Sequence, residues 1–138
     1  MGKMGMKSYR DLEVWKQAMD MVVAVYGLTG EFPAQEKYGL ASQMQRAAVS
    51  VPANIAEGYA RLHRGDYVHH LSMARGSLAE LETHITLAVR LEYVPREKAV
   101  EIWNTTQEVG KMLTGLISSL RRPSKGSLPP SQTLNPRP

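Results

Sequence analysis

The chain has 138 residues, 43% of them hydrophobic and 22% charged, which is the balance of one folded domain rather than of a disordered protein. The absence of cysteine excludes disulfide bonds, thiolate metal sites and cysteine nucleophiles. No apolar run approaches the ~18 residues of a membrane-spanning helix, and the first residues lack a signal peptide, so we expect a cytoplasmic protein with no membrane partner.

The net charge of +4 comes from the two ends of the chain. Residues 1–8 contain two basic residues and 121–138 contain four, with no acid in either segment. The intervening residues therefore hold slightly more acids than bases. A basic tail is more often a solvated segment than a binding arm, so the charge alone is weak evidence for nucleic-acid binding.

The first helix is predicted over residues 9–29, after a disordered segment 1–7 and a capping box formed by Ser8 and Asp11. Two heptad-spaced apolar rows run along it. One row is Leu12, Trp15, Met19, Val22 and Tyr26, and the other is Val14, Ala18, Met21, Val25 and Leu28. Together they cover about 200° of the helix, twice what one bundle needs. This surplus indicates self-association, and we take the second row as the candidate oligomer surface.

The second helix is predicted over 35–61, with Pro52 in its middle. Proline lacks the N–H that the carbonyl of Ala48 needs, so we expect a kink there. Its apolar face is Leu40, Met44, Ala47, Val51, Ile55 and Gly58, and a polar row lies beside that face.

The third and fourth helices are predicted over 66–91 and 95–120, because both segments carry apolar residues at alternating spacings of three and four. Short turns between four such helices predict an all-α fold, an antiparallel up-down-up-down four-helix bundle over residues 8–121. Residues 122–138 are rich in proline and are predicted to form a disordered tail.

No motif in the chain supports catalysis. A phosphate-binding glycine loop, a nucleophile elbow and an HExxH motif are all missing, and no histidine follows a glutamate at the Glu-x-x-His spacing of di-iron bundles. We therefore predict that the protein is not an enzyme and has neither a metal nor a cofactor.

Two polar groups remain as candidate sites. The first is a buried polar network or a subunit contact, and its residues are Arg46, Ser50, Asn54, Glu57, Ser77 and Glu80. The second is a nucleic-acid patch or a solvated corner, and its residues are Arg61, His63, Arg64, His69, His70 and Arg75. Gly76 indicates a close approach of two helices, and Trp15 and Trp103 favour core or interface positions over stacking platforms.

Three runs of residues carry a resemblance to a known family. They are YRDLEVWKQAMDMV (9–22), FPAQEKYGLASQMQRAAVSVPANIAEGYAR (32–61) and GSLAELETHITLAVRL (76–91). These runs closely resemble the four-helix bundle family of proteins encoded in intervening sequences of 23S ribosomal RNA genes. The residues on the family's characteristic positions are Arg46, Ser50, Pro52, Asn54, Glu57, Gly58, Ser77, Glu80 and Glu82. The 61–66 turn and the proline-rich tail depart from the family pattern.

The resemblance implies a bacterial, cytosolic protein without an assigned activity that assembles into a homopentameric ring. The related accessory proteins of diversity-generating retroelements bind nucleic acid and a reverse transcriptase, which implies an RNA-binding or ribonucleoprotein accessory role. The alternative is a scaffold that binds an unidentified protein and has no nucleic-acid role. A basic surface on the ring would favour the first function and an apolar groove the second.

Overall fold

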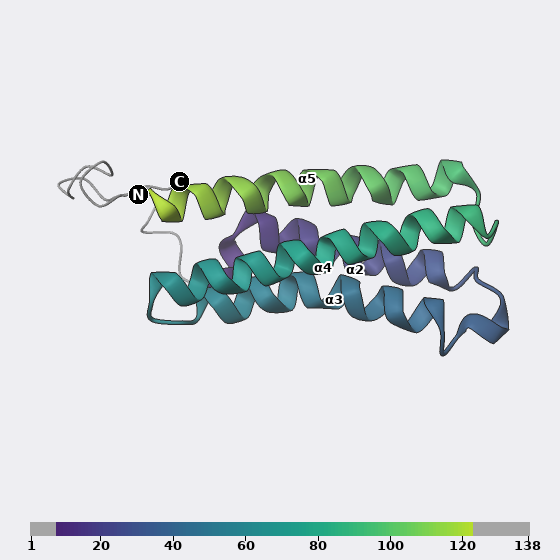
Figure 1. The fold of residues 1–138 in the computed structure, drawn as a ribbon, viewed down its shortest axis with the longest axis horizontal. Helices are drawn as coiled ribbons and strands as arrows, with labels where there is room; N and C mark the ends of the chain where they lie inside the picture. The colour runs from purple at the N-terminus through teal and green to yellow at the C-terminus, as the bar shows by residue number, and fades with distance from the viewer. Residues whose placement is uncertain (1–7, 123–138) are drawn as a thin grey trace, which may run out of the picture.

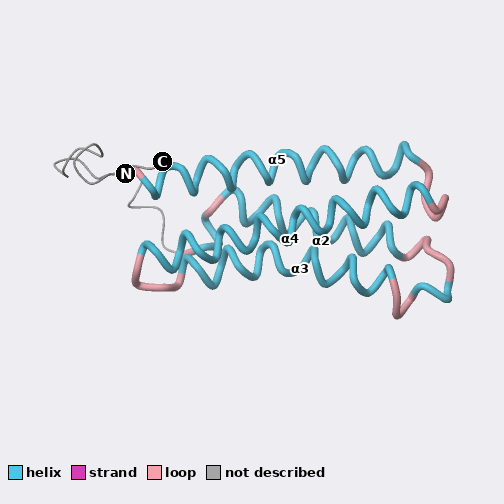
Figure 2. The backbone as a smooth tube through the Cα atoms, in the orientation of Figure 1, coloured by secondary structure: helices cyan, strands magenta, loops and turns pink. Residues whose placement is uncertain are grey.

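The structure is a computed structural model, and it describes residues 8–122. Four long helices form the fold, each antiparallel to the next along the chain, and two 3₁₀ turns precede the first two of them (Figures 1 and 2). In chain order the elements are η1 (Tyr9–Asp11), α2 (Glu13–Thr29), η2 (Ala34–Glu36), α3 (Leu40–Tyr59), α4 (Arg64–Arg90) and α5 (Arg96–Arg121). Residues 8–122 contain no strand. The predicted all-α, up-down-up-down bundle is confirmed.

The bundle has one core, to which all four helices contribute. Helix α2 packs against α3 and α5, and α4 packs against the same two helices, so α2 and α4 are diagonal to each other. Met21, Met44, Leu81 and Leu113, one from each helix, are fully buried. The apolar seams predicted for the third and fourth helices face this core, as the heptad spacing requires.

Helix α2 begins later than predicted. The capping box does form, because the Ser8 Oγ accepts the Arg10 N–H at 3.0 Å and the Asp11 carboxylate accepts the Ser8 N–H at 3.3 Å. It caps only the 3₁₀ turn η1, since Leu12 then adopts an extended conformation with ψ 127°. The α-helix therefore starts at Glu13 and not near Tyr9.

Helix α3 also begins later than predicted, at Leu40, because a glutamate caps it there. The Glu36 carboxylate accepts the Leu40 N–H at 2.9 Å and the Tyr93 hydroxyl at 2.7 Å. These two hydrogen bonds, the first of them the stronger influence, lower the pKa of Glu36 below its usual value. A Cβ on Gly39 would lie 2.6 Å from the Glu36 Oε1, so glycine leaves room for this cap.

Helix α2 ends at Thr29, as predicted, and the remaining boundaries differ from the predictions by one or two residues. Helix α3 ends at Tyr59, α4 spans Arg64–Arg90 and α5 spans Arg96–Arg121. Pro52 is buried inside α3, which continues past it, and the bend predicted at this residue stays a prediction. No helix within residues 8–122 is long and apolar enough to cross a membrane. The disorder predicted for 1–7 and for the tail beyond Arg122 concerns segments outside the described residues.

The turn from α4 to α5 contains a residue with left-handed backbone. Glu92 has φ 61°, the only positive φ outside glycine among residues 8–122. The Tyr93 N–H donates to the Ala88 carbonyl and the Glu92 N–H to the Val89 carbonyl, both at 2.9 Å. This pair of bonds is the Schellman motif, whose left-handed position favours glycine because a Cβ crowds the backbone there.

We expect the substitution Glu92→Gly to raise the free energy of unfolding by about 0.5–1 kcal/mol, since it relieves this crowding. Urea denaturation followed by circular dichroism measures the change. Glu92→Ala is the matched control, because it removes the carboxylate but keeps the Cβ. A glycine variant no more stable than the alanine variant would contradict the prediction.

Candidate functional site

Helix α2 leaves apolar side chains exposed, but they are not those of the row predicted to form the oligomer surface. The candidate oligomer surface Val14, Ala18, Met21, Val25 and Leu28 is buried, with no member more than 5% exposed. These residues face α3 and α5, so the prediction that they form a surface is wrong. Met19, Val23 and Tyr26 are exposed instead, to 40%, 71% and 49%. The exposed apolar residues of α2 are therefore Met19, Val23 and Tyr26, none of which belongs to the predicted row.

A hydrogen-bonded polar network joins α3 to α4. The hydroxyls of Ser50 and Ser77 lie 2.8 Å apart, and the Asn54 amide donates to the Ser50 Oγ at 3.0 Å. The Asn54 side-chain oxygen lies 3.1 Å from the Nδ1 atom of His70. All four side chains are partly buried, so the network satisfies polar groups at the helix interface and fixes the register of the two helices.

His70 belongs to this network and not to the patch in which the sequence placed it. Its side chain is only 12% exposed, and its Nε2 lies 3.9 Å from the Glu57 carboxylate. Glu57 in turn accepts a hydrogen bond from Arg61 at 2.8 Å. The hydrogen bond from Arg61 lowers the pKa of Glu57 most, and the charge of His70 lowers it further. The Glu57 carboxylate thus neutralises part of the charge of Arg61.

Two residues assigned to the network lie outside it. Arg46 and Glu80 are exposed, and within residues 8–122 neither makes a hydrogen bond or an ion pair. Both occupy exposed positions and make no hydrogen bond to the partly buried hydroxyls of Ser50 and Ser77. Of the residues assigned to it, the network thus contains Ser50, Asn54 and Ser77, and Glu57 approaches it through His70.

Helices α3 and α4 approach each other closely at Gly58. A Cβ on Gly58 would lie 2.7 Å from the Cβ of His70 and 3.2 Å from the carbonyl oxygen of Tyr67. Tyr67 packs edge-on against Tyr59 at 5.8 Å, and burial raises its pKa to about 12. A Cβ added at Gly76, by contrast, would meet no atom of another element within 4 Å, so the close approach predicted there is wrong.

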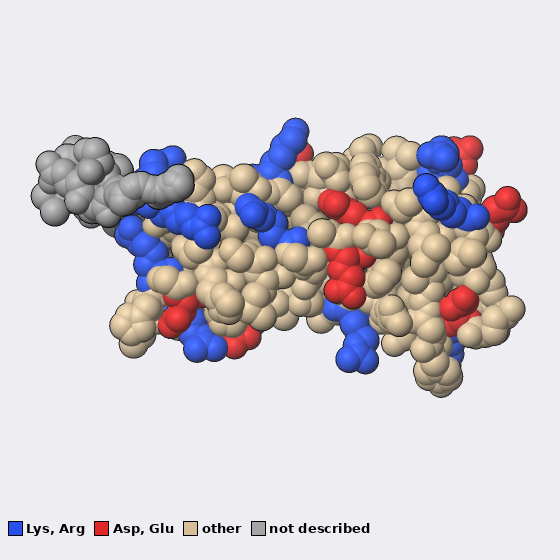
Figure 3. Space-filling view, viewed as in Figure 1, with Lys and Arg blue, Asp and Glu red and all other residues tan. Residues whose placement is uncertain are grey.

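Basic side chains gather at the end of the bundle where α3 meets α4 (Figure 3). Arg64, in the first turn of α4, donates to the carbonyl of Leu120 at 3.3 Å, which places it beside Arg121 and Arg122 at the end of α5. The turn η1 packs on α3 and carries Arg10. We call this cluster the basic end; its members are Arg10, Arg61, Arg64, Arg121 and Arg122. All five side chains are exposed.

The rest of the predicted patch is only partly at this end. His63 is exposed at the N-cap of α4, close to Arg64. His69 is exposed, and its ring meets that of His70 at 5.8 Å. Arg75 lies three turns along α4 and approaches Thr114 on α5, with 3.4 Å between the Nη1 and Oγ1 atoms. Arg75 is therefore separate from Arg61 and Arg64.

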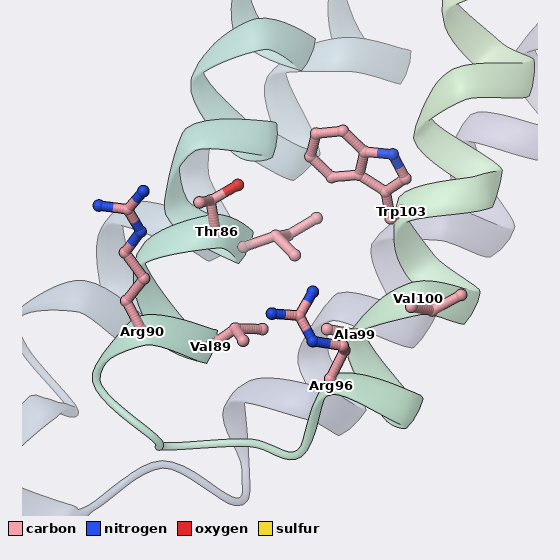
Figure 4. Close-up of a pocket in the computed structure, with 8 residues that line it drawn as sticks. Thr86, Val89, Arg90, Arg96, Ala99, Val100 and Trp103 are labelled. Carbon is pink, nitrogen blue, oxygen red and sulfur yellow. The ribbon is translucent and has the colours of Figure 1, made fainter.

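A groove between α4 and α5 contains two pockets that the sequence did not predict. The pocket near Arg75 has a volume of about 660 Å³. The other, close to the α4–α5 turn, has a volume of about 450 Å³ and is walled by Trp103 (Figure 4). Trp103 is 37% exposed, whereas Trp15 is partly buried and packs edge-on against Tyr9 at 5.3 Å.

The histidines and acids do not assemble a metal site in the part of the chain that the structure describes. Among residues 8–122, no three His, Cys, Asp or Glu side chains converge closely enough to hold a metal ion. His84 is buried, and its Nδ1 has no hydrogen-bond partner among these residues. The features that do stand out are a basic end, an apolar outer row on α2 and the α4–α5 groove.

These features define the class as a four-helix bundle protein that presents charged and apolar surfaces. The chain belongs to the family described as 23S rRNA-intervening sequence proteins, whose model matches residues 10–115. A crystal structure of a protein of unknown function from the S23 ribosomal protein family of Bacteroides thetaiotaomicron VPI-5482 is similar, with a TM-score of 0.71 and 27% identity. The match covers 76% of this chain and 95% of that one. No curated protein matches the chain.

Proposed function

We propose that the chain is a non-catalytic, cytoplasmic RNA-binding module that contacts RNA through its basic end. The observation that carries this proposal is the gathering of exposed arginines from η1, the α3–α4 turn, α4 and the end of α5 at one end of the bundle (Figure 3). Phosphate contacts by arginine are the main source of affinity for nucleic acid. Glu57 already binds Arg61, so Arg64, Arg121 and Arg122 are the residues on which binding depends most.

We further propose that the protein works as a homopentameric ring. The outward row of α2 supports this part, because contiguous apolar surface usually marks a contact. In a ring each subunit repeats its basic end, so a patch that binds weakly in one copy gains avidity when several copies contact one strand.

The RNA-binding proposal is tested by substituting Arg64 and Arg122 with alanine. We expect the double variant to bind an unstructured RNA at least about tenfold more weakly, because two charge-assisted contacts are lost. The salt dependence should flatten by about 0.7 per lost phosphate contact in a log–log plot. Fluorescence anisotropy at several salt concentrations measures both quantities.

Arg46→Ala is the control, since Arg46 is an exposed cation without a partner within residues 8–122 and lies away from the basic end. It should leave both quantities nearly unchanged. Binding that is absent even at low salt, or an equal loss in the Arg46 variant, would remove the basic end as the RNA site.

The second candidate is a scaffold that binds another protein and no RNA. The α4–α5 groove favours it, because the floor includes Ile85, Val89 and Val100. A partner protein would then bind in this groove, and the basic end would serve only to keep the surface hydrated. The RNA titration described above separates the two functions.

A further inference from the structure

The pocket at the α4–α5 turn combines an aromatic wall with two free cations. Its floor and sides are apolar residues of both helices, and Arg90 and Arg96 stand at its edge. Within residues 8–122, neither arginine makes an ion pair or a hydrogen bond, although neighbouring Lys98 is bound to Glu31 at 2.8 Å. None of the eight lining residues is acidic. The pocket therefore attracts an anion.

The side chains of the pocket are arranged to contact a flat apolar group at one end and an anionic group at the other. The indole of Trp103 extends from α5 toward α4 at one end of the pocket, and the guanidinium of Arg96 rises into the pocket from the other end (Figure 4). Arg90 stands on the α4 side, with its guanidinium directed away from the space between Trp103 and Arg96 (Figure 4). A ligand with a flat apolar face and an anionic group on one side matches this arrangement.

The pocket offers many hydrogen-bond donors, on its two arginines and the indole N–H of Trp103, but very few acceptors. The only hydroxyl is that of Thr86, and it already donates to the Glu82 carbonyl at 3.0 Å. An extended peptide would leave its backbone N–H groups without acceptors here, which is unfavourable. A nucleobase can stack on an aromatic ring with its polar edge toward water, and such stacking contributes about 1–3 kcal/mol per base.

We propose that this pocket holds one unpaired nucleotide, with its base on the indole of Trp103 and its phosphate at Arg96. The nucleotide is either free in solution or part of a single-stranded RNA, in which case the inference rests on the proposed RNA-binding function. The pocket has about 450 Å³, within the range of small-ligand sites. Because stacking and charge dominate, binding tolerates any base.

The fluorescence of Trp103 tests the proposal directly. Trp15→Phe leaves Trp103 as the only tryptophan, and this background is titrated at low salt with uridine monophosphate and, separately, with a ten-nucleotide oligouridylate. We expect saturable quenching, because a stacked base quenches an indole. Adding Trp103→Leu should weaken binding, measured by anisotropy of a labelled ligand, by about 5- to 150-fold. Arg96→Gln should weaken it while Arg46→Gln does not.

Quenching by both ligands places a free nucleotide in the pocket, and quenching by the oligonucleotide alone makes the pocket part of a strand-binding surface. An oligonucleotide that binds without quenching, and equally well to the Trp103 and Arg96 variants, overturns the inference and leaves RNA binding by the basic end intact. If the oligonucleotide does not bind but the mononucleotide quenches, only the RNA function fails. If neither binds, both fail. Arg96→Gln changes an exposed side chain, so it decides the question even if Trp103→Leu misfolds.

Discussion

Gly58→Ala is expected to lower the free energy of unfolding by about 2–4 kcal/mol. The new Cβ would lie 2.7 Å from the Cβ of His70, a distance that real Cβ atoms do not adopt. The carbonyl oxygen of Tyr67 is 3.2 Å away, so backbone as well as side chain blocks the methyl group. Helices α3 and α4 must separate, which also pulls Asn54 from His70.

Gly76→Ala is the matched control for this substitution, because it adds the same methyl group in a helix interior. Nothing lies within 4 Å of its added Cβ, and the residue is exposed. Alanine is a better helix former than glycine, so this variant should gain about 0.5–1 kcal/mol. Urea denaturation of both variants measures the difference. Equal stability of the two variants would show that α3 and α4 do not depend on close contact at Gly58.

The existence of the four helices was predictable, and their starts were not. Apolar residues at alternating spacings of three and four report a buried helix face wherever it begins. A helix start depends instead on local contacts that periodicity does not record. Leu12 adopts an extended conformation after the capping box of Ser8. The Glu36 carboxylate accepts hydrogen bonds from the Leu40 N–H and from the hydroxyl of Tyr93 in the α4–α5 turn. The last of these contacts spans 57 residues, beyond the range of local patterns.

The sequence also could not decide which apolar row of α2 faces inward. Both rows have heptad spacing and similar bulk, so the choice depends on how α3 and α5 pack around the helix. Ala18 and Met21 fit the core that these two helices leave, and Met19 and Tyr26 remain outside. Similarly, His70 looked like a surface cation until the close approach at Gly58 brought it to Asn54.

The α4–α5 pocket was missed for a related reason. Arg90 and Arg96 are on opposite sides of a turn, and Trp103 lies two turns further along α5, so no fixed spacing connects them. A usable signal was present, because none of the three belongs to an inward heptad row. Polar and aromatic residues left over from the periodic pattern are therefore worth grouping by the turn that they flank.

Replacing Met19 and Val23 together with lysine is expected to break the proposed ring into single chains. Both residues face outward on α2, at 40% and 71% exposure, so the bundle itself tolerates the charges. In an interface each lysine would lose its hydration without a partner, and the loss of apolar burial adds about 1.5–3 kcal/mol per side chain. A closed ring repeats this contact at each subunit boundary, which multiplies the effect.

Light scattering at micromolar concentration measures the outcome. The wild type should show about five times the chain mass of 15.4 kDa, and the double variant should show the chain mass itself. Leu62→Lys is the control, because Leu62 is 95% exposed in the α3–α4 turn and lies off helix α2. It should leave the assembly intact. A wild type of single-chain mass would end the assembly proposal. If the wild type is a dimer and the double variant a monomer, α2 forms the contact but there is no ring, because a self-complementary contact is complete with two copies.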